Sequence, residues 1–189
     1  MALTKLAGTW SYADLAALPD DGTRYEIING EHYDMPAPTW AHSQVIAGLI
    51  RLLLPVLDRL GGRWATAPLE VFFAGADPVQ PDLVVLLPGS RARPVRRGVA
   101  GPPDLLIEVL SPSNRAHDQV RKREFYARGG VREYWIIDPE QRVIEVIDGR
   151  GITVCRVDAG SEPVLRSPLL GELAVSLYEV VPGVDDLPV

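Results

Sequence analysis

The chain has 189 residues and a formal net charge of −6, with 47% hydrophobic and 23% charged residues. This composition excludes a disordered chain and predicts one globular domain over residues 1–189. The acidity argues against a protein that coats nucleic acid non-specifically. A single cysteine, Cys155, excludes a disulfide framework and a thiolate zinc cluster. We therefore expect a reducing compartment, with the cytoplasm as the default.

The N-terminal part is predicted to form a short helix and then a hairpin. Ser11 and Asp14 resemble a capping box at the start of the helix SYADLAALP. The segments RYEII and EHYDM are predicted strands, because Asn29-Gly30 between them is a strong two-residue hairpin signal.

Residues 40–60 are apolar on nearly every side, which predicts a helix that is buried or at an interface. Pro55 is expected to kink it. The apolar run inside this segment, from Val45 to Leu57, is too short to span a bilayer. The N-terminus lacks an apolar signal core, so neither export nor membrane association is expected.

The remainder is predicted to be a series of strands interrupted by one helix. Strands are expected at PLEVFF, DLVVLL and DLLIEVL, followed by a helix from Arg115 to Arg128 that Gly129-Gly130 ends. Three further strands are expected at EYWIID, RVIEVID and ITVCRVD. Strands linked by both crossovers and hairpins predict an α/β or α+β fold, with a mixed sheet flanked by helices.

Glu108 lies inside the apolar strand DLLIEVL, where an unpaired carboxylate would cost several kcal/mol. Asp82 opens the preceding long strand, and carboxylates on neighbouring strands can hold one divalent cation. Asp104 is the alternative ligand, but four residues along a strand separate it from Glu108 by about 13 Å. We therefore predict that Asp82 and Glu108 bind a metal ion, which would be the partner of Glu108.

The helix after this strand carries a polar stripe. At about 100° per residue, Arg115, Gln119, Lys122 and Tyr126 share one face, which the short connecting turn is expected to set over the carboxylates. Ala116, Val120 and Ala127 form the packing face. Two carboxylates, a hard cation and a lysine together are the groups that a site for phosphodiester hydrolysis needs.

Several motifs together resemble a prokaryotic family of putative restriction endonucleases within the PD-(D/E)xK nuclease superfamily. They are YEIINGEHYDMPAP with WAHSQV, then QPDLVVLL, and then PPDLLIEVLSPSNRAHDQVRKREFYARGGVREYWIIDP. The resemblance covers about residues 10–180. It implies a restriction-endonuclease-like fold, a site that uses Mg²⁺ or Mn²⁺, and DNA as the substrate.

The resemblance implies that Asp82 and Glu108 are metal ligands and that Lys122 is the catalytic lysine. The superfamily pattern expects a lysine two residues after the second acid, where this chain has Leu110. In the family that this chain resembles, a lysine on the following helix takes that role. Lys122 matches this position, although a helical lysine also commonly extends to water.

Five further residues are weaker candidates. Glu31 matches a family glutamate and would add a third catalytic carboxylate, or it is a turn-flanking surface acid. His42 would contact phosphate or orient water, or it is structural. Tyr126 would hydrogen-bond a phosphate or Glu31, or it only packs. Arg115 and Gln119 are further candidates for contacts with phosphate or DNA.

We therefore predict a small Mg²⁺-dependent endodeoxyribonuclease that hydrolyses the phosphodiester bonds of DNA. The alternative is a non-catalytic DNA- or protein-binding module that keeps the nuclease fold, and an unidentified protein partner fits either reading. A homodimer is expected, because cutting both strands of a duplex calls for two sites. Its interface would use the helix at 40–60 or the strands near 143–157.

Overall fold

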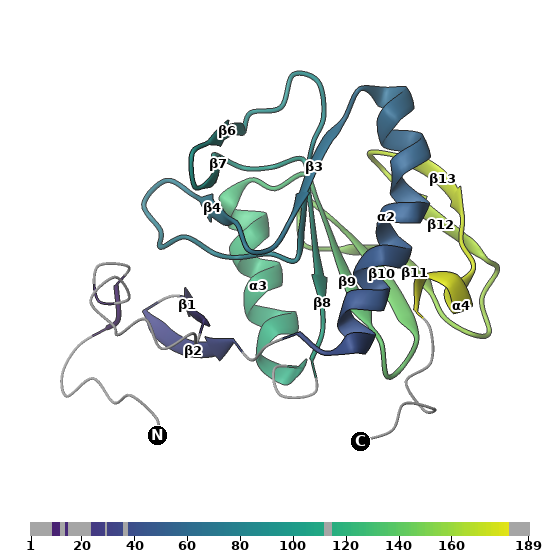
Figure 1. Ribbon diagram of the computed structural model, residues 1–189, viewed down its shortest axis with the longest axis horizontal. Coiled ribbons are helices and arrows are strands. Elements are labelled where there is room, and N and C mark those ends of the chain that lie inside the picture. Colours follow the sequence, from purple (N-terminus) through teal and green to yellow (C-terminus); the bar gives the residue numbers. More distant parts are fainter. Residues whose placement is uncertain are drawn as a thin grey trace.

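The computed structural model describes residues 9–11, 14, 24–28, 30–35, 38–111 and 115–181, with the backbone alone at 24, 26, 28, 31–35 and 115–120. Its central feature is a six-stranded sheet with the order β11-β10-β9-β8-β5-β3. The strands are β3 (Arg63–Thr66), β5 (Leu83–Leu86), β8 (Leu105–Val109), β9 (Glu133–Asp138), β10 (Val143–Asp148) and β11 (Thr153–Val157). Figure 1 shows this sheet between helices α2 (Trp40–Leu60) and α3 (Arg115–Gly129).

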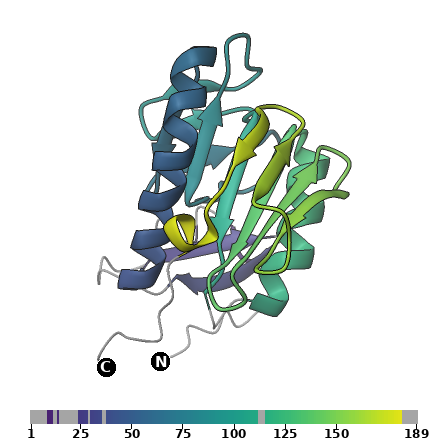
Figure 2. The ribbon, with the colours of Figure 1, turned by 90° about the vertical axis from the view of Figure 1, so that its right-hand side faces the viewer.

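The sheet is mixed, as predicted. β8 and β9 pair in parallel and are joined through α3, while the other neighbours in the sheet pair antiparallel. A parallel pair requires a crossover connection, and α3 supplies it. Figure 2 shows α2 and α3 on opposite faces of the sheet. This arrangement is an α+β fold with a mixed sheet flanked by helices.

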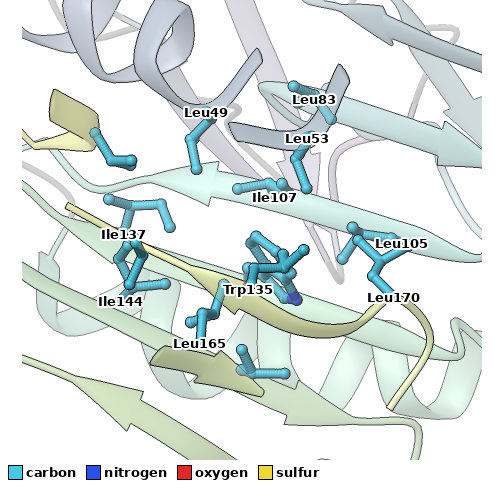
Figure 3. Close-up of a cluster of buried hydrophobic side chains, with 14 of the residues drawn as sticks. Leu49, Leu53, Leu83, Leu105, Ile107, Trp135, Ile137, Ile144, Leu165 and Leu170 are labelled. Carbon is cyan, nitrogen blue, oxygen red and sulfur yellow. The ribbon is translucent and has the colours of Figure 1, made fainter. Parts of the chain in front are cut away.

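Alternation along the strands assigns their residues to the two faces. Leu105, Ile107 and Val109 belong to the apolar cluster that also contains Leu49 and Leu53 of α2. Figure 3 shows Trp135 of β9 among the leucine and isoleucine side chains of this cluster. Leu106 and Leu110 belong instead to the cluster that contains Tyr126 of α3. Glu108, which lies between them in the alternation, therefore faces α3.

Helix α2 begins and ends as the sequence predicts. Thr39 is its N-cap, with a side chain that accepts a hydrogen bond from the His42 N–H, and Gly61 ends the helix at a φ of 69°. A positive φ suits glycine because it has no Cβ. Pro55 lies inside the helix and does not end it.

By length and composition alone, α2 is long and apolar enough to cross a membrane, since the whole helix of 21 residues is longer than the apolar run considered above. Val45, Leu49 and Leu53 are nevertheless buried in the core. Arg51 lies at mid-helix, where its guanidinium donates a hydrogen bond to the Glu179 carbonyl at 3.4 Å. These contacts are those of a helix packed on a sheet.

The predicted hairpin is confirmed. β1 (Arg24–Ile28) and β2 (Glu31–Met35) pair antiparallel, with Ile28 opposite Glu31 across the two-residue connection. In both ribbon views the hairpin lies at the end of the molecule where α2 and α3 begin. The helix predicted from Ser11 lies mostly outside the described residues. Ser11 and Asp14 do make the capping contact, since the Ser11 N–H donates to Asp14 Oδ2 at 2.8 Å.

The prediction found β4 (Glu70–Phe72), within the predicted PLEVFF, but missed the other short strands. β4 joins a small sheet with β6 (Arg93–Val95) and β7 (Gly98–Ala100). β12 (Val164–Ser167) and β13 (Gly171–Ala174) form a separate pair before the short helix α4 (Leu177–Val180). Strands of three or four residues are too short for alternation to identify. β3 was missed because most of its side chains are exposed on this sheet edge.

Candidate functional site

Asp82 and Glu108 lie beside each other at the end of the sheet where β5 begins and β8 ends. Leu83 pairs with Ile107 in the antiparallel register of β5 and β8, so the next pair outward sets Asp82 opposite Glu108. Opposite residues have Cβ atoms about 5 Å apart, and both members of a pair project from the same face. The sequence-based choice of Asp82 as the neighbour of Glu108 therefore agrees with the register.

Glu108 is 5% exposed, and two side chains of α3 are among its partners. Lys122 Nζ lies 3.1 Å from Glu108 Oε1, and the Tyr126 hydroxyl donates a hydrogen bond to the same oxygen at 2.7 Å. Lys122 itself is only 1% exposed. The expectation that a metal ion must be the partner of Glu108 was too narrow, because these two side chains already compensate the buried carboxylate.

Asp82 is held from two directions. Its Oδ2 accepts a hydrogen bond from the Val109 N–H at 2.8 Å, and His42 Nε2 lies 3.2 Å from the same oxygen. His42 belongs to the first turn of α2, so this contact joins α2 to the end of the sheet. The side chains of His42 and Asp82 are 20% and 16% exposed. Asp82 is thus the more accessible carboxylate of the two.

Two of these contacts could not be predicted from the sequence. His42 and Asp82 are 40 positions apart with two strands between them, so only the tertiary fold joins them. The helical spacing did set Tyr126 beside Lys122, but it could not distinguish a phosphate contact from a hydrogen bond to Glu108.

The remaining candidates are only partly described. Glu31 begins β2, but its side chain lies outside the described residues. Arg115 and Gln119 belong to the first turns of α3, and their side chains are also outside. Their expected contacts with metal or phosphate stay predictions.

The donor set suits a hard cation. Two carboxylates on adjacent strands present oxygen ligands, and Mg²⁺ is commonly held by one or two carboxylates with water and phosphate oxygens completing its shell. Among the side chains that the structure describes, no group of three or more His, Cys, Asp or Glu residues could hold a metal ion. Asp82 and Glu108 would therefore leave most coordination positions to water and substrate.

Asp104, the rejected alternative, has a structural role at the other end of β8. Its Oδ2 accepts a hydrogen bond from the Leu87 N–H at 2.8 Å, and its Oδ1 is 2.8 Å from an Arg132 nitrogen. Burial opposes ionisation, but hydrogen bonds from Ser90, the Leu87 N–H and Arg132 outweigh it and lower the pKa of Asp104. Asp104 thus ties β8 to its surroundings away from Glu108.

Replacing Asp104 with asparagine will reduce the loss of stability in acid. A carboxyl with a lowered pKa in the folded state stabilises the fold above its unfolded pKa, near 4, and this contribution is lost as the pH falls through the folded pKa. The midpoint of thermal unfolding, measured from pH 7 to pH 3, should fall less steeply for Asp104→Asn than for the wild type. Equal slopes would contradict the role assigned to Asp104.

The arginines before β8 also make structural contacts. Arg91 donates a hydrogen bond to the Gly130 carbonyl, and Arg97 pairs with Glu70 at 2.8 Å. Gly130 follows the end of α3, whereas Lys122 lies in its middle. The contact of Arg91 therefore lies at the end of α3 and away from Lys122.

Comparisons with known proteins bear on the family and the fold of the chain. The model of the Uma2 family, described as "Putative restriction endonuclease", matches residues 12–178. A similar solved structure is a putative nuclease of the DUF820 family from Anabaena variabilis, with a TM-score of 0.72 and 21% identity over 91% of this chain and 97% of that one. No curated protein matches the chain. The structural likeness supports the fold, and the family match covers most of the chain.

Proposed function

Because the chain belongs to the Uma2 family of putative restriction endonucleases, we propose that it is a Mg²⁺-dependent endodeoxyribonuclease. It would hydrolyse the phosphodiester bonds of DNA at Asp82, Glu108 and Lys122. One observation supports this proposal above the others: Asp82 precedes the strand that pairs beside Glu108, and the Lys122 ammonium lies 3.1 Å from Glu108 Oε1.

Asp82 and Glu108 are the residues that would hold Mg²⁺, with Mn²⁺ as a substitute, because their oxygens are the ligands that these ions prefer. When bound, the ion supplies Lewis acidity, which acidifies water and neutralises negative charge on phosphate. Asp82 is oriented by the Val109 N–H and His42, so its carboxylate is fixed at the end of the sheet. Glu31 is proposed as an additional carboxylate from β2.

Lys122 would do two things in this site. Its ammonium compensates the negative charge of the buried Glu108 carboxylate, so that this carboxylate can serve as an anionic metal ligand. In the complex with DNA, the same group would position the attacking water and stabilise charge on the phosphate. Contacts from α3 across to β8 support the view that a helical lysine replaces the strand lysine of the PD-(D/E)xK pattern, where this chain has Leu110.

DNA would approach from the end of the molecule where α2, α3 and the β1–β2 hairpin meet (Figure 1). His42 lies at this end and is partly exposed, so it is proposed to contact phosphate while it orients Asp82. Arg115 and Gln119, in the first turns of α3, are proposed to contact the DNA backbone.

We also propose that the enzyme is a cytoplasmic homodimer, since two sites are needed to cut both strands of a duplex. Two edges of the structure carry exposed apolar side chains. Leu54 and Trp64 lie at the α2 and β3 edge, and Ile152 and Val154 lie at the β11 edge. Either edge offers apolar surface to a second copy.

Incubation of supercoiled and single-stranded DNA with the purified protein tests the proposal. Cleavage is expected with Mg²⁺ or Mn²⁺, and EDTA should abolish it because the ion is required. Gel electrophoresis of the supercoiled DNA distinguishes nicked from linear product. The absence of cleavage together with the absence of Mn²⁺ binding would favour the non-catalytic module instead.

A further inference from the structure

Tyr126 lies one helical turn after Lys122 on α3, and it is completely buried. Its hydroxyl donates a hydrogen bond to Glu108 Oε1 at 2.7 Å. The Tyr126 hydroxyl is thus engaged with the carboxylate of Glu108, which was not among the contacts that the sequence suggested for it. This hydrogen bond bears on the orientation of the Glu108 carboxylate.

Three aromatic rings fix the position of the Tyr126 ring. Tyr134 packs against it edge-on, with centroids 4.9 Å apart and planes at 67°. Phe125 and Phe73 lie at centroid distances of 5.7 Å and 6.1 Å. Such packing restricts the ring, which favours a hydroxyl directed at Glu108 of β8.

The two donors converge on one oxygen of Glu108. Lys122 contributes a charged group on a flexible side chain, whereas Tyr126 contributes a neutral donor on a clamped ring. A ligating carboxylate needs its own hydrogen bonds to keep a fixed orientation, and loss of such a bond commonly weakens metal binding 10- to 100-fold. Tyr126 has the geometry of that supporting group.

We propose that Tyr126 is a positioning residue that orients Glu108 for binding a divalent cation, an inference that rests on the proposed function. Tyr126 acts through Glu108 and touches neither metal nor DNA. The competing explanation is that Tyr126 only fills space between α3 and the sheet. A phenylalanine would then serve equally well at this position.

The test compares Tyr126→Phe with Tyr134→Phe. Each substitution removes one hydroxyl from the same aromatic cluster and keeps the ring, so losses of packing are matched. Calorimetry with Mn²⁺ should show binding about 10- to 100-fold weaker for Tyr126→Phe and unchanged for Tyr134→Phe. DNA cleavage by Tyr126→Phe should need more Mn²⁺ and approach the wild-type rate when Mn²⁺ is saturating.

Equal Mn²⁺ affinity in Tyr126→Phe and wild type would overturn the positioning role and leave the proposed function standing. Equal weakening in both variants would also overturn it, because the effect would then come from the cluster and not from the bond to Glu108. A wild-type protein that binds no Mn²⁺ would overturn the proposed function and this inference together.

Discussion

Replacing Lys122 with methionine will abolish DNA cleavage and destabilise the protein. Methionine keeps the length of the side chain but leaves Glu108 as a buried carboxylate without its cation. Breaking a buried ion pair in this way costs about 3–5 kcal/mol of unfolding free energy. Loss of a group that stabilises transition-state charge should lower the cleavage rate at least about 100-fold. Denaturant unfolding and cleavage, measured at a temperature where the variant is folded, check the two effects separately.

A second substitution separates catalysis from stability. In the double variant Lys122→Met with Glu108→Gln, both buried charges are gone, and the Gln carbonyl can still accept the Tyr126 hydrogen bond. Stability should therefore recover relative to Lys122→Met, while cleavage stays lost. Arg128→Met, at an exposed position on the same helix, is the matched control and should resemble the wild type. Cleavage by folded Lys122→Met at the wild-type rate would rule out the proposed role of Lys122.

Replacing Asp82 with asparagine will abolish cleavage with little effect on stability. The amide oxygen can still accept the Val109 N–H hydrogen bond, and the side chain is already partly exposed. The unfolding free energy should change by about 1 kcal/mol or less. Removal of the negative charge takes away a cation ligand, so the cleavage rate should fall at least about 100-fold. Plasmid cleavage and thermal unfolding of the same preparation measure both quantities.

Asp104→Asn is the matched control for Asp82→Asn. Both positions follow a proline in a Pro-Asp pair, and both carboxylates accept a backbone hydrogen bond. Asp104 is buried against Arg132, so its replacement should cost about 1–3 kcal/mol and leave cleavage intact. The reverse pattern, with activity lost in Asp104→Asn and kept in Asp82→Asn, would move the site to the other end of β8.

The proximity of Lys122 to Glu108 could be predicted because the two residues lie on consecutive elements of the chain. β8 and α3 are consecutive, and helical periodicity therefore sufficed to set Lys122 over the Glu108 strand. Asp82 could be preferred to Asp104 as the neighbour of Glu108, because the rise per residue along a strand sets Asp104 about 13 Å from Glu108. Apolar runs likewise identified β5, β8 and β9, since these strands are buried throughout. The mixed sheet followed from the pattern of crossovers and hairpins.

Other features depend on tertiary packing that a single sequence does not display. Lys122 was expected in a polar stripe, but the structure buries it almost completely beside Glu108. Whether a lysine in a helix is solvated or buried depends on what packs around it, and here the carboxylate of Glu108 from β8 lies beside the ammonium. The pairing of His42 with Asp82 likewise needs the fold that brings α2 to the end of β5.

Titration of Mn²⁺ into the wild type and Asp82→Asn by calorimetry tests the central claim, that Asp82 and Glu108 together form the cation site, most directly. The account predicts one saturable binding event per chain in the wild type, its loss in Asp82→Asn, and its retention in Asp104→Asn. Unaltered Mn²⁺ binding by a folded Asp82→Asn variant would contradict the site.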